Sequence, residues 1–148
     1  MKAIAIDVDG ALADTRPLWR EWLVDVARRA RVDEELPHDP AAAAGRLDEL
    51  VGNWRTLLER YAEEHGAVHF RRSAEAAGAL RRLEAAGVLV GAFTDSPEPL
   101  ARVALAQLGA GRRIAAFEAG PDALPRLLGR IGAHAVVVRT RADLVRLA

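Results

Sequence analysis

The stretch that decides the fold is Ala3-Ile4-Ala5-Ile6-Asp7-Val8-Asp9-Gly10-Ala11-Leu12-Ala13-Asp14-Thr15. A short apolar run that ends in carboxylates and a glycine is typical of the carboxyl end of a strand in an open α/β sheet, where such sheets bind ligands. Asp7 and Asp9 are two residues apart, so an extended backbone directs both carboxylates to one side. The same residue types also form ordinary turns, because Asp bonds its own backbone and Gly10 accepts a positive φ.

The composition excludes several classes of protein. A chain of 148 residues, of which 51% are hydrophobic, suits one domain with a substantial core. The formal net charge is +0 and acids and bases are interspersed, so we expect neither nucleic acid nor an anionic membrane as a partner. The absence of cysteine excludes disulfides, thiolate zinc sites and cysteine nucleophiles. No apolar stretch is long enough for a bilayer span or a signal peptide, and we expect a cytoplasmic protein.

Residues 15–67 show helical periodicity. Apolar residues recur at three- and four-residue spacing from Pro17 to Ala30, and Pro17 suits the first turn of a helix. We expect two further helices, one over residues 41–51 after Asp39-Pro40, and one from Trp54 that stops at Gly66.

The tryptophans of this helical region are Trp19, Trp22 and Trp54. Each one shares a helical face with other apolar residues. We therefore expect them to pack in a core rather than to stack on a ligand.

From residue 68 onward, strands alternate with helices. The expected strands cover residues 88–93, 114–117 and 135–138, and the expected helices cover residues 73–87, 97–109, 121–131 and, as a short helix at most, 141–148. Such alternation predicts parallel β-α-β units. We expect an α/β, Rossmann-like core made of residues 1–14 and 68–148, interrupted by a small helical insert over residues 15–67.

Two motifs carry a resemblance to a known family. The string from Asp7 to Thr15 resembles the opening motif of the haloacid dehalogenase superfamily, usually Asp-x-Asp-Gly-Thr-Leu, with Ala11 in place of the threonine. The apolar run over residues 88–96, which reaches a hydroxyl at Thr94, resembles the second motif of that family. A threonine after a strand is common by itself, and its value here comes from its position after a cap-sized insert.

The resemblance implies a fold, a reaction and a site. The fold would be a haloacid dehalogenase-like core with the insert as a reduced cap, and the substrate a small phosphorylated metabolite. Asp7 would be the nucleophile that forms an aspartyl-phosphate, and Asp9 the general acid and base. Asp7 and Asp9, the latter through its backbone carbonyl, would also hold Mg²⁺. Thr94, Asp95 and Gly10 would bind the phosphate.

The chain departs from the family at the third and fourth motifs. The third motif normally supplies a lysine, but Gly120-Pro121-Asp122 stands there and the only lysine is Lys2. The fourth normally supplies an aspartate, where this chain has Thr140. A hard cation needs several oxygen ligands, so we expect magnesium to bind weakly or not at all.

Other side chains could replace the missing groups. The carboxylates that follow expected strands are Asp95, Glu118, Asp122 and Asp143, and each is more commonly a helix cap or a surface charge. Arg139, Arg141 or Arg126 could instead bring a fixed positive charge to a phosphate. The alternatives for these arginines are solvent exposure or a salt bridge that closes the pocket. We expect Arg139 to approach Asp7 and Asp9, and include it among the phosphate-binding residues.

Two functions remain open. The first two motifs favour a phosphohydrolase that acts through an aspartyl-phosphate. The missing third and fourth motifs favour a catalytically impaired relative with a binding or assembly role. The last strand usual in the family is also missing, which predicts an exposed apolar sheet edge and a possible homodimer.

Overall fold

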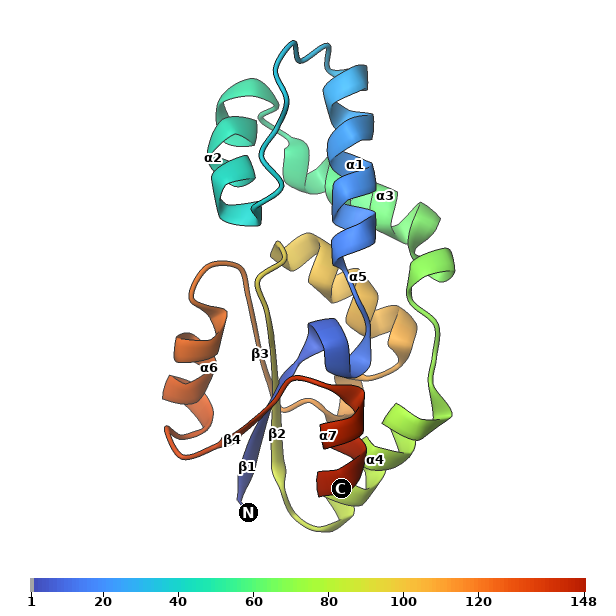
Figure 1. Cartoon of the computed structure of the whole chain (residues 1–148), viewed down its shortest axis with the longest axis vertical. Helices are drawn as coiled ribbons and strands as arrows, with labels where there is room; N and C mark the ends of the chain where they lie inside the picture. The colour runs from blue at the N-terminus through green and yellow to red at the C-terminus, as the bar shows by residue number, and fades with distance from the viewer. Residues whose placement is uncertain (1) are drawn as a thin grey trace.

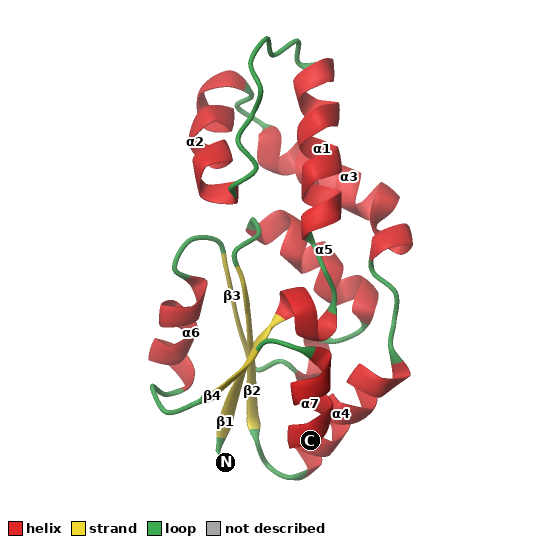
Figure 2. Cartoon of the chain, in the orientation of Figure 1, coloured by secondary structure: helices red, strands yellow, loops and turns green. Residues whose placement is uncertain are grey.

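The computed structural model describes residues 2–148, and within them four parallel strands form a single sheet. The strands are β1 (Ala3–Asp7), β2 (Leu89–Thr94), β3 (Ala116–Ala119) and β4 (Val136–Val138), in the order β3-β2-β1-β4 (Figure 2). Because the strands are parallel, their carboxyl ends lie at one edge of the sheet. The expected α/β, Rossmann-like fold is confirmed.

The helices cover both faces of this sheet. Their bounds are α1 (Arg16–Arg29), α2 (Pro40–Leu50), α3 (Trp54–His69), α4 (Ala74–Ala85), α5 (Glu98–Leu108), α6 (Ala123–Ile131) and α7 (Arg141–Leu147), with short turns η1 (Val8–Leu12) and η2 (Gly111–Arg113). Helix α6 lies on one face, and α4 and α7 lie on the other (Figure 1). None of the helices within residues 2–148 combines the length and the apolar content that a bilayer span requires.

The alternation of side chains along β1 builds the two halves of the core. Ile4 and Ile6 pack with the apolar side chains of α4. Ala5, between them, packs with Phe93 and with Leu127 of α6 on the other face. The strand is therefore buried on both faces, as central strands of parallel sheets are.

The insert, formed by α1, α2 and α3, has an apolar cluster of its own. The rings of Trp19, Trp22 and Trp54 are buried, with centroids 5.5 to 6.4 Å apart. Leu100 and Val103 of α5 belong to the same cluster, so the insert packs directly onto the core (Figure 1). The prediction that the tryptophans serve packing is confirmed.

Several element boundaries differ from expectation, among them the end of α3 and the range of β3. Helix α3 continues beyond Gly66 to His69, so the expected boundary between residues 67 and 68 falls inside a helix. A Cβ on Gly66 would lie 2.6 Å from the Gln107 Oε1 atom, so this glycine permits close packing of α3 on α5 and does not end the helix.

Strand β3 pairs with β2 over residues 116–119, two residues later than the expected range 114–117. The difference arises because the hydrophobicity of a residue indicates its burial. It does not indicate whether the backbone of that residue pairs with a neighbouring strand. Glu118 belongs to this ladder although it is polar, since β3 is an edge strand.

Candidate active site

The acidic turn and the hydroxyl that closes β2 meet at the carboxyl edge of the sheet. β1 and β2 are neighbours, with Asp7 in register with Phe93. Thr94, the next residue of β2, is buried and donates its hydroxyl proton to Asp9 Oδ2 over 2.7 Å. The expectation that these side chains share one edge is confirmed.

The turn η1 places the two carboxylates. The backbone N–H of Asp9 donates to Asp7 Oδ1 at 3.0 Å, which holds the two residues in a fixed relation. Gly10 follows with a φ of 106°, a conformation that favours glycine. A Cβ on Gly10 would lie 2.5 Å from the carbonyl oxygen of Arg139, so the end of β4 closes tightly against the turn. The Gly10 N–H donates to Ala13 O at 2.8 Å, so this amide is already engaged within the turn.

Asp9 is surrounded by hydrogen-bond donors. Its Oδ1 accepts from both the backbone N–H and the hydroxyl of Thr15, at 2.7 and 2.8 Å. The Thr15 hydroxyl in turn bonds to the Ser96 hydroxyl at 2.5 Å, and the Ser96 N–H donates to Thr94 Oγ1 at 3.2 Å. These buried hydroxyls link the turn after β1 to the loop after β2. Thr15 and Ser96 were not predicted as site residues, although each is a polar residue beside a recognised motif.

The protonation of Asp7 is strongly altered by its surroundings. Burial raises the pKa of Asp7 from 3.8 to about 6, and the negative charge of Asp9 raises it as well. The hydrogen bond from the Asp9 N–H and the positive charge of Arg139 act in the opposite direction. A carboxyl group with a pKa near 6 in a cavity is a functional-site candidate on physical grounds.

Arg139 reaches the acidic pair, as expected. Its Nη1 lies 3.2 Å from Asp7 Oδ2, and its guanidinium stands 5.4 Å from the ring centroid of Phe93. Arg139 follows β4, which is paired to β1 with Ile6 opposite Val138. The sheet register therefore brings this arginine beside Asp7.

The other two candidate arginines serve the scaffold, and neither brings its guanidinium to Asp7 or Asp9. The guanidinium of Arg141 donates to Ala11 O at 2.5 Å, to Leu12 O at 3.0 Å and to Ser73 Oγ at 2.9 Å, so it ties α7 to η1 and α4. Arg126 turns back to carbonyl groups of the β3–α6 loop, including Ala119 O at 2.6 Å.

The candidate substitute carboxylates divide into two groups. Asp95 and Asp122 line the same cavity as Asp7. Glu118 pairs instead with arginines of α6, at 3.5 Å. Asp143 lies in the first turn of α7 and pairs with Arg146. The latter two carboxylates are thus engaged in ion pairs within or beside helices.

These residues do not fit a magnesium ion, which needs several oxygen ligands. Within residues 2–148, no group of three or more His, Cys, Asp or Glu side chains is arranged to hold a metal. Asp7 Oδ2 lies 3.2 Å from the Arg139 guanidinium, which competes with a metal ion for this oxygen. In the described part of the chain, the expected ligands Asp7 and Asp9 have no third carboxylate that completes a metal site with them.

A cavity of about 610 Å³ opens over Asp7 and Asp9, and we call it the Asp7 cavity. Its wall combines the sheet edge with the start of α2, at Pro40 and Ala41, and with the start of α6, at Ala123. A cavity of this size accommodates a small metabolite. The core supplies Asp7 and Asp9, and the insert covers part of the opening.

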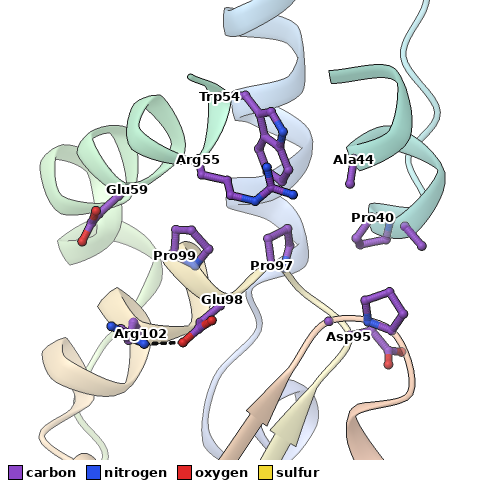
Figure 3. Close-up of a pocket in the computed structure, with 13 residues that line it drawn as sticks. Pro40, Ala44, Trp54, Arg55, Glu59, Asp95, Pro97, Glu98, Pro99 and Arg102 are labelled. Carbon is purple, nitrogen blue, oxygen red and sulfur yellow. Dashed lines mark hydrogen bonds and ion pairs between the residues drawn. The ribbon is translucent and has the colours of Figure 1, made fainter. Parts of the chain in front are cut away.

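A second hollow of about 460 Å³ adjoins the Asp7 cavity and shares Pro40, Ala41, Asp95 and Pro121 with it. We call it the side pocket. Figure 3 shows the Arg55 guanidinium beneath the Trp54 ring, at 4.3 Å from its centroid, with Pro97 and Pro99 on the wall formed by the start of α5. The cleft thus continues from the acids into the contact between insert and core.

No protein-family model matches this sequence, and no curated protein matches it. Solved structures do resemble it. CbbY from Rhodobacter sphaeroides, in complex with phosphate, superimposes with a TM-score of 0.71 at 17% identity over 93% of this chain and 76% of that chain. A HAD phosphatase from Thermococcus onnurineus gives 0.60 at 20% identity over 94% and 77%. At such identities the likeness shows the fold, and the expected haloacid dehalogenase-like fold is confirmed.

Proposed function

We propose that this protein hydrolyses small phosphomonoesters and that Asp7 is transiently phosphorylated. The observation that carries the proposal is that Asp7 and Asp9 line an open cavity and that the buried Thr94 hydroxyl is bonded to Asp9. Phosphoryl transfer requires a nucleophile, a group that exchanges protons and polar groups around the phosphate. All three kinds of group are present at this edge. The similar protein CbbY was solved with phosphate and, as a mutant, with xylulose-(1,5)bisphosphate, which supports the same class of ligand.

The reaction proceeds in two displacements. A carboxylate oxygen of Asp7 attacks phosphorus, the bond between phosphorus and the ester oxygen breaks, and Asp9 gives a proton to the departing alcohol. Asp9 then takes a proton from water, which attacks the phosphorus of the aspartyl-phosphate and releases inorganic phosphate. Asp7 is regenerated, and the sum is one ester plus one water to one alcohol plus one phosphate.

The hydrogen bonds of Asp9 set a condition on this sequence. Its Oδ2 accepts the Thr94 proton and its Oδ1 accepts two donors from Thr15. Three lone pairs of the Asp9 carboxylate are thus engaged, and one on Oδ2 stays open. When the Thr94 hydroxyl leaves Asp9, it becomes free to donate to a phosphate oxygen. We therefore assign Thr94 the role of donating a hydrogen bond to the phosphate. This role begins when the substrate breaks the hydrogen bond between Thr94 and Asp9.

Hydrolysis of an aryl phosphate tests the proposal. The variant Asp7→Asn keeps the size of the side chain and removes its nucleophilic charge, so its rate should fall at least ~1,000-fold. Asp143→Asn is the matched control, since Asp143 lies on α7 and pairs with Arg146. The control should keep the parent rate. Equal rates from the parent and Asp7→Asn would reject the proposal.

A second candidate function is phosphate-ester binding without turnover. The ion pair between Arg139 and Asp7 favours it, because it occupies one oxygen of the nucleophile. The three hydrogen bonds that Asp9 accepts within the protein favour it as well, because they hold this carboxylate in place. This alternative predicts that the parent binds phosphate esters yet gives no hydrolysis above that of Asp7→Asn.

A further inference from the structure

We propose that the Asp7 cavity binds phosphate oxygens without a divalent cation and that the Arg139 guanidinium supplies the positive charge beside Asp7. This inference rests on the proposed function and specifies how that site compensates charge. Three features of the structure carry it: the ligands that are absent, the position of Arg139, and the charge of the cavity wall.

The donor set around Asp7 is unsuited to a metal but suited to an anion. No third metal-ligating side chain joins Asp7 and Asp9 within residues 2–148. A guanidinium lies 3.2 Å from Asp7 Oδ2, and at such distances it would repel a divalent ion strongly. The same guanidinium matches the geometry of phosphate oxygens, to which it can donate two parallel hydrogen bonds.

Arg139 is held at the site by its backbone. A Cβ on Gly10 would lie 2.5 Å from the Arg139 carbonyl oxygen, so the end of β4 rests against the turn that carries Asp9. Pairing of Ile6 with Val138 fixes the register of the two strands. The guanidinium therefore extends from a rigid part of the sheet, as preorganised binding groups do.

The Arg139 guanidinium also has N–H groups beyond the one that contacts Asp7. Its contact with Asp7 uses Nη1, and the guanidinium carries five N–H groups. The side chain is 59% exposed and lines the Asp7 cavity. A phosphate that reaches the floor of the cavity can thus bind the guanidinium while Asp7 stays beside it.

Among the side chains that line the Asp7 cavity, Arg139 is the cation on which phosphate binding depends. The other arginine that lines the cavity, Arg16, is paired with Asp14 at 2.7 Å. Asp39, Asp95 and Asp122 also line the cavity. Because carboxylates outnumber arginines there, a phosphate dianion depends strongly on the one guanidinium at Asp7.

Calorimetric titration with inorganic phosphate tests the inference. The parent protein should bind phosphate in the presence of a chelator, with the same affinity when Mg²⁺ is added. Arg139→Ala should weaken phosphate binding at least ~10-fold. Arg139→Lys should restore part of the lost affinity, because lysine keeps the positive charge but cannot donate two parallel hydrogen bonds. Arg112→Ala is the control, since Arg112 is exposed in η2, before β3 and away from the carboxyl edge.

A double variant provides the converse test. Arg139→Gly with Thr140→Asp removes the guanidinium and adds a carboxylate after β4. Thr140 is the N-cap of α7, where its side chain accepts from the Asp143 N–H, and aspartate serves equally well as an N-cap. This variant should bind phosphate only when Mg²⁺ is present.

The outcomes separate the inference from the proposed function. Binding by the parent that requires Mg²⁺, or that is unaffected by Arg139→Ala, overturns the inference and leaves the hydrolase proposal standing. No binding under either condition also overturns the inference, and the hydrolase proposal is then decided by the rates of the parent and Asp7→Asn. Metal-independent binding by a parent that hydrolyses no faster than Asp7→Asn supports the inference and rejects the hydrolase.

Discussion

At the scale of single residues, Asp7 is a carboxyl group held in a site that disfavours its charge. Its pKa is about 6 in the folded protein, against 3.8 ordinarily, chiefly because of burial. Between these two values the folded chain holds a proton that the unfolded chain releases, so stability declines as pH rises through this window. Ionised Asp7 thus lowers the free energy of unfolding at pH 7.5 by about 2–3 kcal/mol.

Asp7→Asn should therefore stabilise the protein at pH 7.5, by ~1–3 kcal/mol, after allowance for the lost and largely exposed ion pair with Arg139. The gain should vanish below about pH 4, where Asp7 is protonated in both states. Urea unfolding at the two pH values measures the difference. Asp9→Asn is the contrasting control, because it disturbs a carboxylate that accepts three hydrogen bonds and should destabilise. A loss of stability in Asp7→Asn at pH 7.5 would contradict this assignment.

Gly10 and Gly87 provide a second test at the residue scale. Both have a positive φ, 106° and 75°. Alanine at Gly10 would place Cβ against the Arg139 carbonyl, whereas alanine at Gly87 would meet no atom within 4 Å. Gly87→Ala should cost about 1 kcal/mol from backbone strain alone, and Gly10→Ala should cost about 3 kcal/mol or more. Equal losses in denaturant unfolding would show that β4 does not press on the turn.

Much of the site could be predicted from the sequence because the motif residues follow strands whose carboxyl ends meet at one edge of a parallel sheet. Asp7, Asp9, Thr94 and Arg139 come together for that reason. The partners of Asp9 were less accessible to prediction. Thr15 reaches Asp9 only because the η1 turn folds back, and no periodicity in the sequence reports such a turn.

At the scale of elements, small residues determine how closely the layers approach. A Cβ on Gly91 of β2 would lie 2.8 Å from Leu127 Cδ1 and 3.1 Å from Ile131 Cδ1 of α6. Gly91→Ala should force α6 outward and destabilise the protein by ~1–3 kcal/mol. Gly129→Ala is the matched control, because it lies in α6 with no atom within 4 Å and should stabilise the helix by up to ~1 kcal/mol. Thermal unfolding that ranks the two variants in the reverse order would contradict this packing.

The order and type of the elements were predictable from hydrophobic periodicity, but their ends were not. Gly66 looked like a helix stop and is instead a contact point between α3 and α5. That role depends on Gln107, more than forty positions along the chain, and so on tertiary structure. Glycine alone cannot distinguish a helix end from a close approach.

At the scale of the whole molecule, the sheet ends at β4. Val136 and Val137 of this edge strand are 39% and 38% exposed. An edge strand with exposed apolar side chains favours pairing with another chain. The expected homodimer stays a prediction, which static light scattering tests: a dimer mass supports it, Val137→Lys should return the monomer mass, and a monomeric parent rejects it.

The core and the insert contribute different residues to the walls of the Asp7 cavity and the side pocket. The core contributes Asp7 and Asp9, and the insert contributes Pro40 and Ala41 to both the Asp7 cavity and the side pocket. The insert shares an apolar cluster with α5, so the two parts are packed together around the cleft. The alcohol part of a substrate would thus meet the insert, while the phosphate meets the core.

The most direct measurement of the central claim is the mass of the peptide that contains Asp7 after rapid acid quench during turnover of an aryl phosphate. Asp9→Asn should accumulate the intermediate, because an aryl leaving group needs little protonation while attack by water needs a base. We predict that this peptide gains the mass of one phosphoryl group in Asp9→Asn, and that no peptide gains it in Asp7→Asn. Hydrolysis by the parent with the phosphoryl group on another residue, or an unmodified Asp7 peptide in Asp9→Asn, would contradict the account.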